Sequence, residues 1–254
     1  MKSLLIYIVI SIFSGRPVKW ALAPALSPDG EYIAFSYRGD IWIAPSQGGL
    51  AIRVTSTSAF ETNPIFSPDG KWLAYTSDES GNSEIYVVST DGSSAPKRVT
   101  YHPDGENPFY FTEDSKYIVF SASMYDFRGG VYKIPVQGGN PQKLFDFVVN
   151  EVYHIDSEHY IIERGNAPWY RKGYGGPAAS ELYLYDKSKN TFVRLTENNL
   201  RDARPMYSKY KGGLFFLSNR GEDGSTNLYF MDLESRNVTQ LTKFSEEINW
   251  ARIS

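Results

Sequence analysis

The 254-residue sequence contains no cysteine and only three histidines. The first absence excludes disulfide bonds and every metal site that depends on thiolate ligands. A surplus of one charge is also lacking, because 26 basic residues stand against 29 acidic ones and the formal net charge is −3. Such a chain has no excess of basic residues with which to bind nucleic acid or an anionic membrane surface. We therefore expect neither as a partner.

Motifs of catalytic and nucleotide-binding sites are missing as well. The chain has no G-x-S-x-G, H-E-x-x-H, P-loop or G-x-G-x-x-G motif, and its histidines have no partner at a metal-ligand spacing. The stretch Asp78–Glu84 alternates oxygen-bearing side chains as a calcium loop does, but Ser83 stands where such a loop needs glycine. The sequence therefore predicts no catalytic residue, no metal site and no cofactor.

A long apolar run occurs only at the start of the chain, which reads MKSLLIYIVISIFSG. The run from Leu4 to Phe13 is too short to span a bilayer but matches the central region of a secretory signal. We predict a signal peptide over residues 1–15, a periplasmic or secreted protein, and no membrane span. The alternative is a buried first strand in a cytoplasmic protein.

What the sequence does contain is a repeat of short strands. SPDG occurs at Ser27–Gly30 and again at Ser67–Gly70, 40 positions later. Its residues suit the corners of a tight turn, and the flanking EYIAFSY and KWLAYTS alternate like strands, whereas no helical stripe is found. Five copies of the pattern end at Thr55, Thr100, near Phe145, Thr196 and Thr242. A spacing of roughly 45 to 50 residues is typical of four-stranded propeller blades.

We therefore predict an all-β fold, a six-bladed β-propeller of four-stranded antiparallel blades over residues 16–254. The blades would be residues 21–55, 56–100, 101–145, 146–196 and 197–242, with the start of a sixth at 243–254. About five blades would be complete and the sixth cut off, because the final INWARIS matches the first strand of another copy. Soluble proteins normally avoid such open sheet edges, so we expect the chain to be an N-terminal fragment of a longer polypeptide.

The repeat and two further segments of the chain resemble known protein families. The pattern P-x-x-SPDG-x-x-IAF, followed by GDIW, GG and RVT, resembles the TolB-type propeller repeat. The stretch WYRKGYGGPAASELYLYD (Trp169–Asp186) resembles the fourth blade of tricorn-type proteases, and Lys19–Trp42 is similar to the start of bacterial tricorn-like serine peptidases. The resemblance implies a first, six-bladed propeller that precedes a second propeller and the catalytic domains. The family's catalytic residues lie in those later regions, so none is carried over to this chain.

The function implied by the resemblance is gating or docking of peptide substrates for a C-terminal catalytic region, so the parent protein would be a serine-type peptidase. Its partners would be peptides and the C-terminal domains of the same chain, and homo-oligomerisation of the full-length protein stays open. One alternative is a TolB-like periplasmic protein-binding propeller, although TolB proteins carry an α/β domain first and the first blade here begins by Pro24. The other is the propeller of a prolyl-oligopeptidase-type peptidase.

Two groups of residues are candidates for substrate-channel or docking contacts. In an up-and-down blade, the connectors between blades enter the first strands and share one face with the loops between second and third strands. This places six connector residues near the channel mouth, namely Glu61, Asn63, Glu106, Asn107, Arg201 and Asp202. The second group is Trp169, Arg171 and Lys172, in an insertion that spans Arg164–Ser180. The alternative for the connector residues is that they only form a solvated rim. The alternative for the insertion is a long loop held in place by its own aromatic residues.

Overall fold

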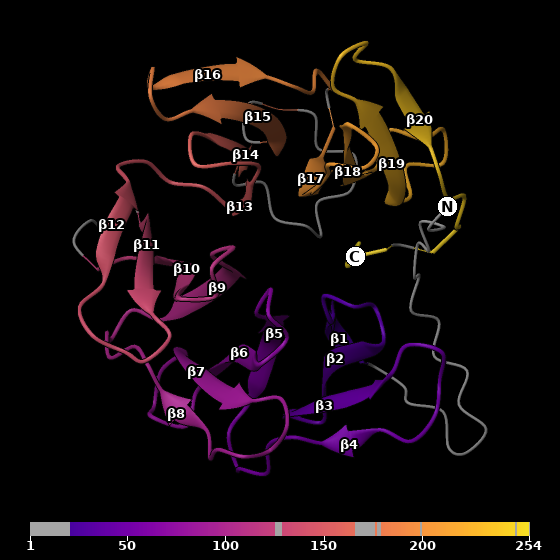
Figure 1. The fold of residues 1–254 in the computed structure, drawn as a ribbon. Coiled ribbons are helices and arrows are strands. Elements are labelled where there is room, and N and C mark those ends of the chain that lie inside the picture. The colour runs from indigo at the N-terminus through magenta and orange to yellow at the C-terminus, as the bar shows by residue number, and fades with distance from the viewer. Residues whose placement is uncertain are drawn as a thin grey trace. The chain divides into compact units, whose positions relative to one another are not determined.

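The computed structural model describes residues 21–124, 129–165, 176, 179–198, 200–246 and 248–253. The predicted signal peptide and most of the blade-four insertion, including Trp169, Arg171 and Lys172, lie outside these residues. The described chain divides into two compact units, residues 21–148 with 252–253, and residues 149–251. Figure 1 labels the strands of each unit.

The first unit contains three four-stranded antiparallel sheets, each in the order of its sequence. The strands of the first sheet are β1 (Leu22–Leu26), β2 (Tyr32–Tyr37), β3 (Asp40–Pro45) and β4 (Ile52–Arg53). Those of the second are β5 (Glu61–Phe66), β6 (Trp72–Ser77), β7 (Glu84–Ser89) and β8 (Lys97–Arg98). Those of the third are β9 (Glu106–Phe111), β10 (Tyr117–Ala122), β11 (Gly130–Pro135) and β12 (Gln142–Phe145).

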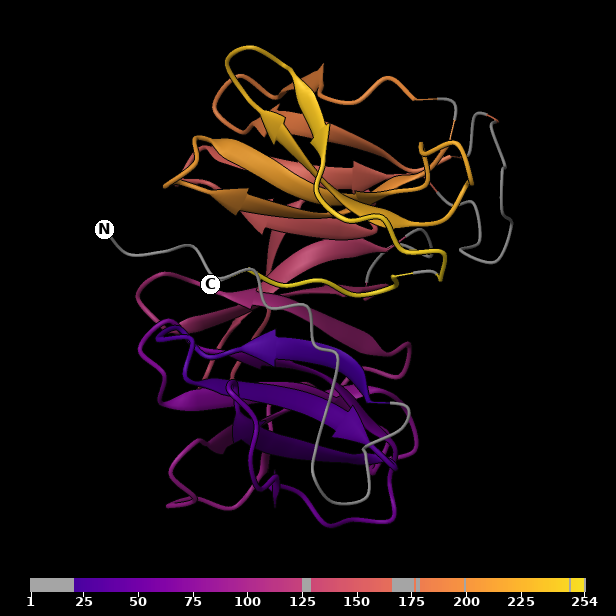
Figure 2. The same cartoon turned by 90° about the vertical axis from the view of Figure 1, so that its right-hand side faces the viewer.

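The second unit contains two more sheets of the same kind. The strands of the fourth sheet are β13 (Glu151–His154), β14 (His159–Arg164), β15 (Glu181–Asp186) and β16 (Thr191–Arg194). Those of the fifth are β17 (Asp202–Ser208), β18 (Gly213–Ser218), β19 (Asn227–Asp232) and β20 (Val238–Gln240). Figure 2 shows the fifth sheet, coloured orange to yellow, as a twisted antiparallel ribbon of four strands.

These sheets confirm the predicted fold class, an all-β propeller of four-stranded antiparallel blades. Of the six predicted blades, the described residues contain five, and residues 243–246 and 248–253 form no strand. Within the described part of the chain there is also no helix with the length and apolar character that a membrane crossing requires.

The SPDG corners join the first and second strands of blades one and two. Gly30 N–H donates to Ser27 O at 2.9 Å, and Ser27 Oγ donates to Asp29 Oδ1 at 2.5 Å. The same two bonds recur at Gly70 and at Ser67 with Asp69, at 2.9 and 2.6 Å. Gly30 and Gly70 have φ values of 75° and 70°, which glycine adopts without steric cost. The repeated sequence is thus a repeated turn.

The first strand of a blade is an edge strand, and four of the five carry a proline, Pro24, Pro64, Pro108 and Pro205. Proline lacks an N–H and is tolerated at such an edge and at bulges. The residue before it has a positive φ in three strands, 50° at Ala23, 52° at Asn63 and 56° at Arg204, and the register shifts at each of these places. These bulges re-aim the side chains at the start of the strand.

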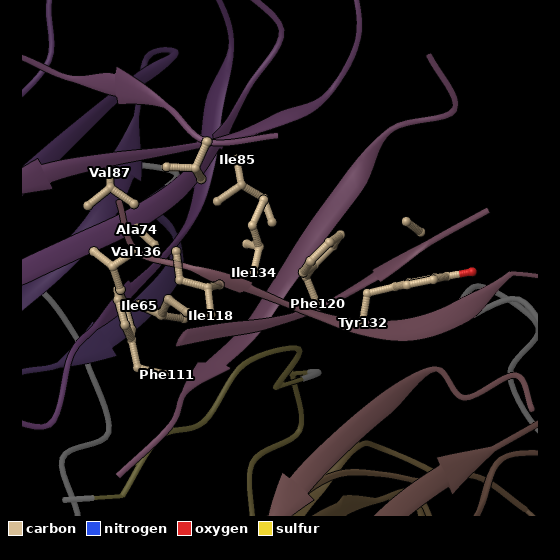
Figure 3. Packing of buried hydrophobic residues seen from close by; sticks show 12 residues of the cluster. Ile65, Ala74, Ile85, Val87, Phe111, Ile118, Phe120, Tyr132, Ile134 and Val136 are labelled. Atoms are coloured by element: carbon tan, nitrogen blue, oxygen red, sulfur yellow. The ribbon is translucent and has the colours of Figure 1, made fainter. Parts of the chain in front are cut away.

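Apolar side chains between neighbouring sheets form the core of each unit. Figure 3 shows one cluster of the first unit, which combines Ile65, Ile85 and Val87 of the second sheet with Phe111, Ile118, Phe120 and Ile134 of the third. In the second unit, Ile161 and Leu182 of the fourth sheet pack with Leu214 and Phe216 of the fifth. The alternation of each strand therefore buries both of its faces against neighbouring blades.

Candidate functional site

The first strands of consecutive blades contact one another within each unit. In the first unit β5 lies against both β1 and β9, and in the second unit β17 lies against β13. The predicted docking residues stand at or next to the beginnings of β5, β9 and β17, and of these residues the structure brings Asn63 together with Asn107. The leading residues of these strands therefore make up the candidate site.

Three of the predicted residues turn into the fold. The side chains of Glu61, Glu106 and Asp202 belong to residues that are 1%, 3% and 0% exposed. Each backbone N–H donates at 2.8 Å to a carbonyl in the preceding blade, that of Gly39, Ser83 or Ser180 respectively. These bonds attach the start of each blade to the blade before it. A direct contact with a peptide would require these carboxyl groups to leave their buried positions.

A threonine two residues after the fourth strand bonds to the third strand of the same blade. Its hydroxyl accepts the N–H of the second residue of the third strand at 2.8 to 3.0 Å in four blades, at Thr55, Thr100, Thr196 and Thr242. The same hydroxyl donates to a buried side-chain oxygen, that of Glu61, Glu84, Glu181 or Asn227. In the third blade Phe145 stands at this place and is buried. The repeated final threonine of the sequence is therefore a structural bond.

The carboxyl groups of Glu84 and Glu106 come together at the junction of the second and third blades. Thr100 Oγ1 lies 2.8 Å from Glu84 Oε2 and 3.2 Å from Glu106 Oε2, and Arg98 forms an ion pair with Glu84. Burial, together with the nearby Glu84 carboxylate, raises the pKa of Glu106 to about 8. Burial also raises the pKa of Glu61. The hydrogen bonds that Thr55 and Thr57 donate to its carboxyl group partly offset this rise. The Glu106 carboxyl group therefore retains its proton near neutral pH.

Asn63 and Asn107 form an amide pair across the same two blades. Asn63 Nδ2 donates to Asn107 Oδ1 at 2.7 Å, and both residues are half-buried. Among the described residues neither side chain has another hydrogen-bond partner, so Asn63 Oδ1 accepts nothing and Asn107 Nδ2 donates nothing there. Rotating both amides by 180° again leaves one carbonyl and one amino group free. The pair thus offers one acceptor and one donor.

In the second unit the corresponding polar residues are paired within the protein. Asp202 forms an ion pair with Arg220 at 2.8 Å, and Arg201 N–H donates to Asn219 Oδ1 at 2.9 Å. Arg204, which the sequence analysis did not select, donates through its guanidinium to Glu151 at 2.9 Å. Its guanidinium also lies 3.9 Å from the centroid of the Trp250 ring. The residue–proline step that recurs in four of the first strands is the sequence signal from which this position could have been found.

Glu163 is a buried carboxyl group beside Arg204. Its Oε2 accepts the backbone N–H of Arg204 at 3.0 Å, and the residue is 4% exposed. Burial raises the pKa of Glu163, and the nearby Glu151 carboxylate adds to this effect. This unpredicted cluster joins Arg204, in the first strand of blade five, to Glu163 near the end of β14 and to Glu151 at the start of β13.

A cavity of about 450 Å³ opens between the first and second blades in the first unit. Its lining includes Leu22, Arg38, Gly39, Ser58, Phe60 and Asp78. None of these residues is predicted from the sequence to form a site, because no motif links positions so far apart. The volume falls in the range of small-ligand sites, roughly 300 to 1,000 Å³.

The histidines take structural positions. His159 Nδ1 lies 2.9 Å from Asp156 Oδ1 on an exposed turn, and His102 Nδ1 lies 3.8 Å from Asp104. The ring of His154 packs edge-on against Tyr160. The described residues contain no group of three acidic, histidine or cysteine side chains that could hold a metal ion.

Comparison with known proteins gives consistent matches over most of the chain. A family model for the tricorn protease N-terminal beta propeller domain matches residues 20–253. Tricorn protease homolog 1 of Streptomyces coelicolor is 30% identical over 212 residues, which cover 80% of this chain and 19% of that protein. The tricorn protease homolog of Saccharolobus solfataricus is 28% identical over 230 residues, 85% of this chain and 20% of that protein.

Among solved structures, the crystal structure of the tricorn protease superposes with a TM-score of 0.74 at 20% identity. The superposition covers 88% of this chain and 22% of that chain, and it shows a common fold. The chain spans about a fifth of the length of the curated relatives that it matches.

Proposed function

Since the chain belongs to the family of tricorn protease N-terminal β-propeller domains, we propose that it is the non-catalytic propeller of a tricorn-like serine peptidase. In this role it docks peptide substrates, or controls their access, for a catalytic region outside this chain. Two homologous proteins, of whose length the matches cover 19% and 20%, carry the name tricorn protease homolog, which supports placement of the propeller within a larger peptidase. The substrates and the remaining domains of the same protein are the proposed partners.

The observation that carries the docking role is the amide pair of Asn63 and Asn107. A residue of an extended peptide presents its N–H and its C=O on the same side of the chain, and among the described residues the pair presents one carbonyl and one amino group without a partner. Main-chain recognition of this kind does not depend on the side chains of the peptide. It therefore suits a domain that handles many different peptides.

The buried carboxyl groups take a different part in this proposal. Glu61, Glu106 and Asp202 hold the blades together through the bonds described above, so their replacement would disturb the fold before it reported on a peptide. Asn63, Asn107 and Arg201 remain partly accessible. The docking role of Trp169, Arg171 and Lys172 stays a prediction, since these residues lie outside the described part of the chain.

The proposal is tested with the purified 254-residue chain and an N-acetylated, C-amidated octapeptide that carries a fluorescent label. We expect binding without hydrolysis, and a loss of affinity of about tenfold in the double variant N63G/N107A, since two hydrogen bonds of about 1 kcal/mol or less each are removed. Glycine at position 63 retains the φ of 52°. The matched control is Asn190→Gly, which alters another asparagine at φ 52°, in the β15–β16 turn.

Hydrolysis of the peptide by the isolated chain would contradict the non-catalytic role. Equal affinities of the double variant, the control and the unchanged protein would contradict docking at the amide pair. In the full-length protein, the double variant should slow the cleavage of long peptides more than that of dipeptide-sized substrates.

A further inference from the structure

We infer that the cavity between the first and second blades binds short peptides that have free ends and an apolar side chain. The cavity lies within the first unit and is separate from the Asn63–Asn107 pair, neither member of which lines it. Its chemistry is set by three elements, namely the β2–β3 turn, the connector before β5 and the residue after β6.

The walls of the cavity are held in place by hydrogen bonds within the protein. Phe60 N–H donates to Asp78 Oδ1 at 2.7 Å, and Glu61 N–H donates to Gly39 O at 2.8 Å. At Gly39 a Cβ atom would lie 3.3 Å from the carbonyl oxygen of Ala59, so the turn and the connector approach closely. The site is therefore formed before a ligand arrives, which reduces the cost of binding.

Two residues of opposite charge line this cavity, and no ion pair joins them. Arg38 and Asp78 both line it and are both exposed, yet within the described residues neither forms an ion pair. The Arg38 guanidinium packs 5.3 Å from the ring centroid of Tyr37, and Asp78 uses one oxygen for Phe60 N–H. An arginine guanidinium can donate two parallel hydrogen bonds to a carboxylate, and an aspartate carboxylate accepts hydrogen bonds from an ammonium group. A zwitterionic ligand satisfies both at once.

Apolar surface lies beside these charges. Phe60 is 52% exposed and Leu22 is 43% exposed, and both line the cavity. The Ser58 hydroxyl, also in the lining, forms no hydrogen bond with the described residues. A ligand with one apolar side chain would cover Phe60 and Leu22, and its peptide bond would pair with Ser58. This combination distinguishes a short peptide from a sugar or a nucleotide.

The backbone at Arg38 supports a role beyond turn formation. Arg38 and Gly39 have φ values of 54° and 86° in the two-residue β2–β3 turn. Turns of this kind favour Asn, Asp or Gly at the first position, because the left-handed conformation is unfavourable for long side chains. An arginine is nevertheless held there, and this residue lines the cavity.

The test uses the 254-residue chain and the dipeptide leucyl-leucine, with binding followed by calorimetry or by NMR shifts. Both Arg38→Gln and Asp78→Asn should weaken binding about tenfold, as loss of a charge-assisted bond requires. The D78N variant retains Oδ1 as acceptor for Phe60 N–H, and Phe60→Ser should weaken binding by removing the apolar wall. The matched control is Arg236→Gln, another exposed arginine of positive φ, 61°, in a hairpin turn.

N-acetyl-leucyl-leucinamide, which lacks both end charges, should bind at least tenfold more weakly than the free dipeptide. The inference is overturned if the two dipeptides bind equally, if no dipeptide binds, or if R38Q and D78N match R236Q. The double variant N63G/N107A separates this site from the proposed function, because it should leave dipeptide binding unchanged. Circular dichroism of every variant checks that the fold is retained.

Discussion

Glu84 and Glu106 share one threonine hydroxyl although they belong to different blades. Thr100 Oγ1 lies 2.8 Å from one carboxyl group and 3.2 Å from the other, and it also accepts Ile85 N–H. A hydroxyl has a single proton to donate, so it can satisfy only one of the two carboxylates. Among the described residues, Glu106 Oε1 has no partner at all. The junction is therefore most stable when Glu106 carries a proton.

The stability of the chain should fall as pH rises across the neutral range. The pKa of Glu106 is about 8 in the folded protein against an ordinary value of 4.5, so the folded state binds this proton more tightly than the unfolded state. The stabilisation is complete below pH 4.5 and is lost as pH approaches and passes 8, by up to ~3 kcal/mol. Urea unfolding between pH 5 and 9 measures it. Glu106→Gln should flatten this dependence, and an unchanged slope would refute the shared proton.

Replacing Thr196 by valine should destabilise the second unit by ~2 kcal/mol. The Thr196 hydroxyl accepts Leu182 N–H at 3.0 Å and donates to Glu181 Oε2 at 2.6 Å, and all three residues are buried. Valine removes both bonds and leaves the buried N–H without an acceptor. Thr242→Val should cost less, because the hydroxyl there donates to the neutral Asn227. Urea unfolding of the variants, with the exposed Thr191→Val as control, provides the comparison. Equal losses at Thr196 and Thr191 would show that the bond contributes nothing.

Alanine at Gly213 should destabilise the fifth blade by ~2–3 kcal/mol through steric overlap. A Cβ atom there would lie 2.3 Å from the Phe230 ring and 2.5 Å from Met231 O. The adjacent Gly212 is the control, since a Cβ at that residue meets no atom within 4 Å and only its φ of 60° opposes alanine, at a cost of ~1 kcal/mol. Thermal unfolding ranks the two variants. A larger loss for Gly212→Ala would contradict the packing described here.

Arg204→Gln should lower stability by ~1–2 kcal/mol and shift the fluorescence of Trp250 to longer wavelength. The change removes the ion pair with Glu151 at 2.9 Å, whose side chains are 26% and 14% exposed, and uncovers the indole ring. Emission spectra and urea unfolding record both effects. Arg236→Gln, on an exposed turn, should change neither. A spectrum that stays the same in R204Q would place Trp250 elsewhere.

Local sequence determined the blades themselves. The stretches Tyr32–Ser36 and Trp72–Thr76, predicted as strands after the SPDG corners, lie within β2 and β6, each one residue longer. The turn chemistry of Ser, Pro, Asp and Gly acts over four residues, and alternation of side chains acts over a single strand. Both signals are therefore complete within a short window of sequence.

Tertiary structure alone decided what the polar residues of the first strands do. Glu61 and Asn63 are two positions apart, yet the first is buried under Thr55 and the second meets Asn107, 44 residues away. The direction of each side chain depends on the bulge at Asn63, and its partner depends on how the next blade packs. The cavity between Arg38 and Asp78 has the same origin. Sequence repeats specify a blade, whereas the contacts between blades arise only when their registers and bulges are combined in three dimensions.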